Sequence, residues 1–209
     1  MRTEPVRLAL YVLLMTNITT ALTSTGLDWN RALLDQLTWH WDNQLRPRLE
    51  GLTDQEYLRE PVPGCWNVRP RGTSTASVQA GSGAMTIDFA FPEPDPALVT
   101  TIAWRLGHVV VGVLGVRCAT HFAGPAMDYM THDYAATADA ALAQLDAGYA
   151  RWVDGVRGLG AKGVLSPCGP GEGPFAEASM AELVLHIHRE MLHHGAEIAL
   201  LRDLYRVSS

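Results

Sequence analysis

Apolar residues recur at the spacing of an α-helix in four stretches of the chain, and convincing strand-like alternation is almost absent. In the first stretch Asp28 suits a helix N-cap, and Pro47 marks the end of the helix or a kink in it. The apolar positions of this helix recur every three or four residues and are Leu33, Leu34, Leu37, Trp41 and Leu45. A chain of 209 residues is long enough for one such helical domain with a substantial core.

Three further stretches show the same helical pattern. The second predicted helix begins with Asp95 and Pro96, ends near residue 122 and is apolar nearly all round, so it should be central. An alanine-rich third helix begins at residue 134 or 137 and ends at 158, and the fourth runs from about 175 to 205. We therefore predict an all-α protein, a four-helix bundle.

The connection between the first two long helices is unusually long. Thr53 and Glu56 in TDQE form a capping-box pattern that predicts a short helix. Residues 61–84 follow and are rich in Pro, Gly, Ser and Thr. A connection of this length is usually functional or mobile. We expect an irregular loop that wraps the bundle, with a lid over a pocket as the alternative.

Residues 1–27 precede the predicted domain, which covers residues 28–209. Arg2 and Arg7 precede the apolar run LALYVLLM, a pattern that also fits a short signal peptide. The alternatives are an extra helical turn or a start codon placed before the true one at Met15. The run is too short to span a bilayer. We interpret it as an N-terminal extension of a cytoplasmic protein.

Composition argues against several classes of partner. The chain has 16 Lys and Arg residues against 22 Asp and Glu, a net charge of -6, and no basic run, so nucleic acid is not expected as a partner. The 3 cysteines are far apart and form no C-x-x-C pair, which indicates a reducing compartment. Arg105 and His108 interrupt the apolar stretch TIAWRLGHVVVGVLGV, which favours a buried core helix over a membrane span.

The stretch HREMLHHGAEIALLRDLY concentrates polar residues in an otherwise amphipathic helix. With Glu190 at zero and a step of about 100° per residue, the apolar stripe covers about 20° to about 100°. His194 at about 40° and Glu190 at zero both lie within the apolar face, so we expect both side chains to point into the core. His186 and His193 fall near the margin at about 320° and 300°, and His188 at about 160° should face solvent.

Glu190 and His194 are the residues of this helix that we predict to bind a metal. Their i, i+4 spacing lets both side chains grip one ion, although a buried Glu–His hydrogen bond explains the spacing equally well. His108, in the middle of the second helix, is the expected third ligand. Gly112 and Gly115 leave space beside its ring for a bound small molecule, with close helix contact as the alternative. Three ligands leave the fourth position open, as in catalytic zinc sites.

Four segments together resemble the DinB-like superfamily of four-helix metalloproteins, particularly its actinobacterial members: LLDQLTWHWDNQLRPRLEGLTDQEY, PVPGCWNVRPRG, IAWRLGHVVVGVLGVRCATHF and HIHREMLHHGAEIALLRDLY. The resemblance implies a divalent metal bound by a histidine of the second helix and a His-x3-His pair of the last. His108 and His194 match two of these positions. Glu190 departs from the commoner histidine but is similar to the mycothiol-dependent maleylpyruvate isomerase branch, whose zinc is held by His, Glu and His.

The function implied by this resemblance is metal activation of a low-molecular-weight thiol, with mycothiol as the suspected thiol and zinc, nickel or another divalent ion as cofactor. Such thiol transferases attack an electrophilic small molecule in detoxification or secondary metabolism. His40, His193 and Glu197 are candidates for assisting proton transfer. Arg105 and Arg117 are candidates for binding a substrate carboxylate, with ordinary ion pairs as the favoured alternative.

Two other functions stay open at this point: a non-catalytic metal-binding protein that acts in stress or ligand binding, and a metal-dependent hydrolase. The isomerase itself is disfavoured, because it has a further C-terminal domain whereas this chain ends four residues after Tyr205. The expected partners are a small-molecule thiol and an electrophile, without nucleic acid or membrane, and a homodimer is possible.

Overall fold

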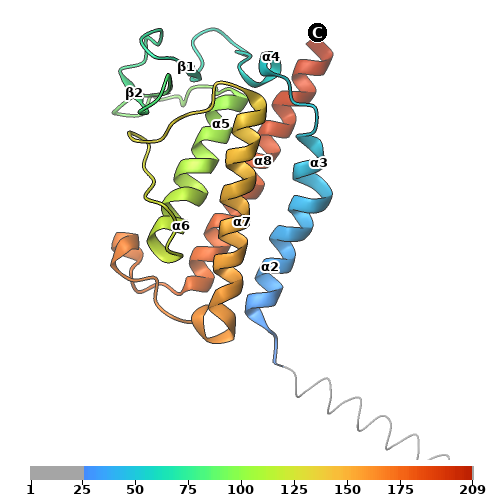
Figure 1. The fold of residues 1–209 in the computed structure, drawn as a ribbon, viewed down its shortest axis with the longest axis vertical. Helices are drawn as coiled ribbons and strands as arrows, with labels where there is room; N and C mark the ends of the chain where they lie inside the picture. Colours follow the sequence, from blue (N-terminus) through green and yellow to red (C-terminus); the bar gives the residue numbers. More distant parts are fainter. Residues whose placement is uncertain (1–25, 209) are drawn as a thin grey trace, which may run out of the picture.

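The computed structural model describes residues 26–208 (Figure 1). Within that range four long helical segments lie side by side, and a small sheet and several loops cover one end of them (Figure 1). The structure is therefore mainly helical, as expected. The interpretation of the N-terminal extension concerns residues that, except for the last two, lie outside the described range.

The first segment begins and ends where the sequence predicts. It consists of three consecutive stretches: α2 (Trp29–His40), the π-helical η1 (Trp41–Leu45) and α3 (Arg46–Arg48). The Asp28 side chain accepts a hydrogen bond from the backbone N–H of Arg31, which confirms Asp28 as the N-cap. Pro47 lies in the last turn, and the helix ends at the next residue.

The short helix α4 (Asp54–Tyr57) confirms half of the predicted capping box. The Thr53 hydroxyl accepts from the backbone N–H of Glu56, as a cap should. The carboxylate of Glu56 does not reach back to the cap and instead binds the guanidinium of Arg202, in the last helix, α8 (Met180–Ser208).

The second segment starts later than predicted. It comprises α5 (Ile102–His108), the π-helical η2 (Val109–Gly115) and α6 (Val116–His121). Asp95 and Pro96 are therefore wrong as the helix start, and Thr101 is the N-cap. The reason is tertiary: the backbone of Trp66 pairs with Val99 and Thr101, and these bonds hold the chain extended up to the cap.

The last two segments are α7 (Ala138–Gly163) and α8 (Met180–Ser208). Thr137 caps α7, in agreement with the later of the two predicted starts. The helix runs beyond the predicted end at 158, with a break at Gly160, whose φ of 59° only glycine adopts easily. The fourth helix starts after the predicted residue 175, because residues 170–175 form the separate 3-10 turn η3 (Pro170–Phe175).

The connection predicted to be irregular contains most of a three-stranded antiparallel sheet, which corrects the expectation of an all-α fold. Its strands, in the spatial order β1-β3-β2, are β1 (Val68–Pro70), β2 (Val78–Ala80) and β3 (Met85–Phe89). Two strands have only three residues each, so the period-2 alternation that reveals a strand is too short to detect. Ile87 of β3 is fully buried, so the sheet belongs to the core.

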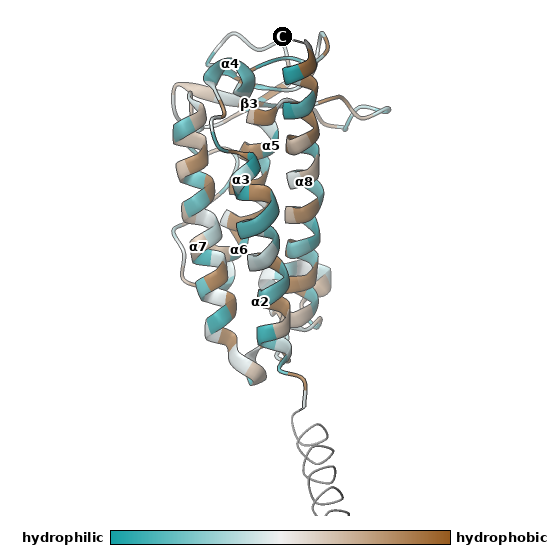
Figure 2. Ribbon diagram, turned by 90° about the vertical axis from the view of Figure 1, so that its right-hand side faces the viewer, coloured by the Kyte–Doolittle hydropathy of each residue, from teal (hydrophilic) through white to brown (hydrophobic). Residues whose placement is uncertain are grey.

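The core lies between the helical segments, and its largest fully buried side chains include Trp152, Leu37, Leu106, Leu145 and Met191. Along α7 and α8 hydrophobic and hydrophilic residues alternate, as in amphipathic helices (Figure 2). Among the described helices the segment Ile102–His121 is apolar and long enough to cross a membrane. Of its most apolar window 61% is buried inside the protein, as in a core helix.

The buried face of α8 is wider than the sequence predicts and lies further round the helix. From Glu190 at zero, buried positions cover about 20° to about 160° of the helical wheel. They are Met180, Leu183, Val184, Ile187, His188, Met191, His194, Gly195, Ile198 and Arg202. The cause is that α8 packs against α2, η2 and α5 together. The prediction that His188 faces solvent is therefore wrong.

His188 is 5% exposed, and its ring lies 6.3 Å from that of Trp152. Burial lowers the pKa of His188 to about 4. Because the unfolded chain has a histidine pKa of about 6.5, it binds more protons than the folded chain between these values. The free energy of unfolding should thus be unaffected by His188 above about pH 7 and fall by roughly 3 kcal/mol between pH 6.5 and 4.

Urea denaturation at pH 7, 6 and 5 measures this loss. A His188→Leu variant should lose less stability than the wild type over this range, while His193→Gln, which alters an exposed histidine of the same helix, should keep the wild-type dependence. Equal pH slopes for the wild type and His188→Leu would contradict the assignment.

Candidate metal centre

The Glu190 and His194 side chains contact each other on one face of α8. Glu190 Oε2 lies 3.5 Å from His194 Nε2. His194 is buried, as the helical wheel predicts, whereas the Glu190 side chain is 24% exposed and lies at the margin of the buried face, which corrects the expectation that it points into the core. Glu190 Oε1 is also 3.7 Å from His186 Nδ1 and 3.6 Å from Arg189 Nε, so the positive charge of Arg189 faces it from the solvent side.

The other nitrogen of His194 is held by Glu197, whose Oε2 lies 2.7 Å from His194 Nδ1. Arg105 binds the same carboxylate oxygen at 3.1 Å, and its Nη1 lies 3.5 Å from Nδ1. The shorter contact to Glu197 identifies Nδ1 as the protonated nitrogen. In the neutral ring Nε2 carries the lone pair and faces Glu190, which is the arrangement that a carboxylate imposes on a metal-binding histidine.

His108, at the end of α5, brings a second imidazole to His194. The two rings are 4.7 Å apart and nearly perpendicular, at 89°. His108 stacks on Trp104, with ring centroids 5.4 Å apart, and its Nδ1 lies 2.7 Å from the hydroxyl of Tyr129. Burial, reinforced by the charges of His194 and Arg105, lowers the pKa of His108 to about 4, so the ring is neutral near pH 7.

The donor set fits a divalent ion, because two imidazoles and one carboxylate are common zinc ligands. A different set is more tightly gathered: His193, His194 and Glu197 are the described residues whose donor atoms all lie within 4.8 Å of one another. Arg105 already neutralises Glu197, and its guanidinium would repel a cation at His194 Nδ1. The Nε2 side of His194, toward Glu190 and His108, is the better cation site.

The space beside Gly112 and Gly115 is filled by the chain itself, not by a ligand. A Cβ atom on Gly112 would lie 1.9 Å from the hydroxyl oxygen of Tyr129, and one on Gly115 would lie 2.6 Å from Cγ of Met127. At these two glycines the structure contradicts both the predicted space for a bound small molecule and the alternative, a close contact between two helices. They let the segment after α6 approach η2 and place Tyr129 on His108.

Gly112→Ala is expected to destabilise the protein by about 1–3 kcal/mol, because the new methyl group must displace Tyr129. Gly158→Ala in α7 is the matched control, since nothing lies within 4 Å of the new Cβ atom. That variant should be stabilised by up to about 1 kcal/mol through helix propensity. Urea denaturation measures both changes, and a stabilised Gly112→Ala protein would exclude the close approach of Tyr129.

The remaining predicted residues are engaged in other contacts. Arg105 and Arg117 form ion pairs, with Glu197 and Glu172 respectively, which agrees with the favoured alternative for both. His40 bonds to Gln44 of its own segment at 2.8 Å. Within residues 26–208 no hydrogen bond, ion pair or ring contact joins His40 to the three candidate metal ligands, so the structure does not bring it to the centre.

A pocket of about 410 Å³ adjoins His108, and its walls are mostly aromatic. It lies between the small sheet and α5, and the large side chains around it are Trp66, Phe89, Phe91, Trp104, Tyr129 and Met130. Sequence reasoning missed this pocket, because half of these residues lie before α5 in a region interpreted as irregular or placed in the wrong element. The signal in the sequence that could have indicated the pocket was the concentration of aromatic residues around that region.

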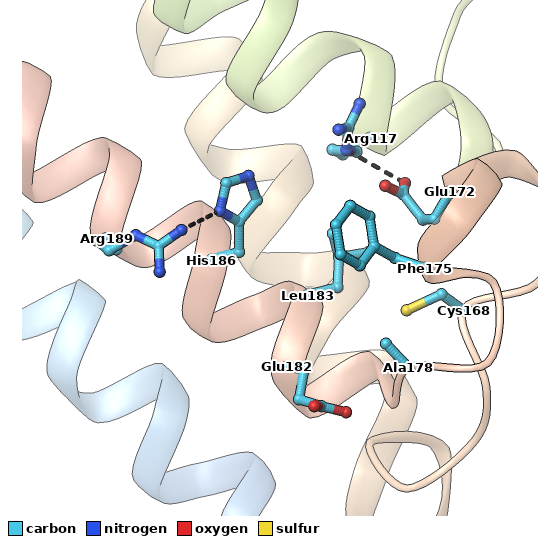
Figure 3. A pocket seen from close by; sticks show the side chains of 9 residues that line it. All are labelled: Arg117, Cys168, Glu172, Phe175, Ala178, Glu182, Leu183, His186 and Arg189. Carbon is cyan, nitrogen blue, oxygen red and sulfur yellow. Dashed lines mark hydrogen bonds and ion pairs between the residues drawn. The ribbon is translucent and has the colours of Figure 1, made fainter.

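A second pocket, of about 340 Å³, lies between α6, η3 and α8 (Figure 3). Its arginines are paired with carboxylates: Arg117 Nε lies 3.2 Å from Glu172 Oε1, and Arg189 Nε lies 3.6 Å from Glu190 Oε1. Phe175 extends into the space between them (Figure 3). Because Glu172 already binds Arg117, this pocket has little free positive charge for a substrate carboxylate.

The fold and this centre define a mainly helical protein whose core contains a cluster of imidazoles and carboxylates. A family model described as DinB superfamily matches residues 36–198, a range that includes His108, Glu190 and His194. The chain therefore belongs to the DinB superfamily, as its motifs suggested. Comparison with curated proteins and with solved structures gave no match.

Proposed function

We propose that this protein is a metal-dependent thiol transferase of the mycothiol-dependent type, built on a four-helix bundle. His108, Glu190 and His194 would hold one divalent ion, with zinc favoured by the mixed nitrogen and oxygen donors. The observation that carries the proposal is the meeting of two imidazoles beside a carboxylate, at the edge of an aromatic pocket.

The residues around these ligands fix the donor atoms before any ion arrives. Glu197 accepts the Nδ1 proton of His194 and, held by Arg105, orients the ring so that Nε2 faces Glu190. Tyr129 has the same role for His108, whose Nδ1 it contacts at 2.7 Å. A bound zinc ion would lower the pKa of a thiol that binds to it, so that the thiol would be present near neutral pH as the nucleophilic thiolate.

Each of the chain's own groups has a role in this chemistry. Glu190 supplies the negative charge that favours a cation at the site, and its partial exposure gives solvent and the thiol access from that side. Glu197 lies 3.4 Å from the exposed His193, which offers a route to solvent for a proton released at His194. The aromatic pocket beside His108 would hold the apolar body of the electrophile.

A non-catalytic metal-binding or ligand-binding protein is the second candidate. The specific observation that favours it is that Tyr129 fills the space beside His108 which the glycines were expected to leave for a substrate. In that case the same three residues would serve stability or sensing. A small-molecule thiol as partner, and a homodimer, are part of the transferase proposal.

A thiol-consumption assay separates the two candidates. Zinc-loaded protein is mixed with a bimane electrophile and with mycothiol, glutathione or bacillithiol in turn. We expect turnover above background with one thiol and a loss of about 100-fold or more in Glu190→Ala. Asp203→Ala, an exposed carboxylate further along α8, is the control and should keep full activity. Bound metal without turnover for any thiol would favour the non-catalytic candidate.

A further inference from the structure

The pocket beside His108 is walled by stacked and edge-on aromatic rings. Trp66 and Trp104 lie 5.8 Å apart with an interplanar angle of 27°, and Phe89 meets Trp104 edge-on at 5.6 Å. Phe89 also meets Tyr129 at 5.1 Å with an angle of 84°. Rings fixed in this way present flat faces and edges that complement a planar aromatic molecule.

The polar groups of this wall are largely committed to the protein. The indole N–H of Trp104 donates to the backbone oxygen of Asp88 at 2.8 Å, and the Tyr129 hydroxyl bonds to His108. Among the described residues that line the pocket, Glu93 is the only carboxylate, and no lysine or arginine is present. Glu93 is exposed, so its carboxylate belongs to the mouth of the pocket.

We propose that this pocket binds a planar aromatic molecule that carries a protonated amine, with the ring between the aromatic walls and the amine at Glu93. The volume of about 410 Å³ is within the range of small-molecule sites and suits two or three fused rings. The end of the molecule opposite the amine then faces His108. That the bound molecule is the electrophile rests on the proposed function, whereas the binding itself does not.

Three matched probes test the charge preference: 2-(aminomethyl)naphthalene, neutral 2-methylnaphthalene and 2-naphthoate. Their dissociation constants are measured by calorimetry on the full-length protein in the presence of a chelator. We expect the amine to bind about three- to fivefold more tightly than the neutral probe, the size typical of one partly exposed ion pair, and the carboxylate to bind more weakly than either. Glu93→Gln should remove the preference for the amine and leave the neutral probe unchanged.

Two exposed phenylalanines locate the bound probe, because each lines a different pocket. Phe91→Ser should weaken binding of all three probes by about three- to tenfold, as expected for the loss of one ring contact. Phe175→Ser, in the pocket of Figure 3, should have no effect. The reverse pattern would overturn the assignment, as would a change from dimer to monomer in Phe91→Ser, because the aromatic rim would then be a subunit contact.

The outcomes of this test and of the thiol assay are independent, because the probes are added to protein without metal. Selective binding of the amine at Glu93 supports the pocket assignment even where no thiol is consumed. Thiol turnover by a protein that shows no preference among the probes overturns the pocket assignment and leaves the transferase proposal in place.

Discussion

Replacing His108 by alanine is expected to weaken zinc binding by at least about 100-fold, because the imidazole from α5 is the one ligand that joins the two helices through the ion. In the structure its ring meets that of His194 at 4.7 Å and is positioned by Trp104 and Tyr129. Removal of His108 leaves only Glu190 and His194, both from α8. Competition with a zinc-binding dye measures the dissociation constant.

His193→Ala is the informative control, because it separates the two sets of possible ligands. His193 belongs to the more tightly gathered set with His194 and Glu197, and its side chain is 61% exposed. We expect this variant to bind zinc within a few-fold of the wild type. Full loss of zinc in His193→Ala with normal affinity in His108→Ala would place the ion at the set that includes Glu197.

Glu56→Ala should reduce the free energy of unfolding by about 3–5 kcal/mol, the largest effect on stability that we expect from replacing one buried side chain. Glu56 and Arg202 are each 4% exposed at their side chains, and Arg202 Nε lies 2.6 Å from Glu56 Oε1. Arg202 also donates to the backbone oxygen of Glu50 at 3.0 Å. Without Glu56 the guanidinium stays buried with no opposing charge.

Urea denaturation tests this prediction against an exposed ion pair that joins the first helical segment to α8. Asp203→Ala breaks the pair with Arg48. The side chains of Arg48 and Asp203 are 46% and 53% exposed, so the free energy of unfolding should fall by less than about 1 kcal/mol. The double variant Glu56→Leu/Arg202→Met should recover much of the stability, because it removes both charges. Equal losses in Glu56→Ala and Asp203→Ala would show that burial does not govern the pair.

The helices were predictable because their signals are local. Asp28, Thr53 and Thr137 each cap a helix through a hydrogen bond to a backbone N–H three residues ahead, and that pattern is visible in the sequence. Thr101 caps its helix in the same way, through the backbone N–H of Trp104, but its choice over Asp95 as the start was not predictable. It depends on backbone pairing with Trp66, which lies far away along the chain, and the short strands of the sheet depend on similar long-range contacts.

The candidate centre was predictable to the same extent. The i, i+4 spacing of Glu190 and His194 is a local feature, and the contact between their side chains follows from helix geometry. The burial of His188 and the filling of the space at Gly112 are set by Trp152 and Tyr129, from other parts of the chain. A helical wheel built on one stripe cannot represent a helix that several elements cover.

The supporting contacts and the aromatic pocket also required the fold. Glu197 was singled out for proton transfer, and its bonds to Arg105 and to His194 Nδ1, which position the ring, could not be predicted from the sequence. Tyr129 had no assigned role in the sequence, since nothing local connects it to His108. Both residues act through contacts between segments, which residue spacing within one helix does not reveal.

The metal content of the purified full-length protein tests the central claim most directly. After expression in zinc-replete medium and removal of loosely bound ions, elemental analysis should give about one equivalent of a divalent metal per chain in the wild type. Glu190→Ala and His194→Ala, prepared in parallel, should contain far less. A wild-type protein without stoichiometric metal, or variants that retain it in full, would contradict the assignment of His108, Glu190 and His194 as its ligands.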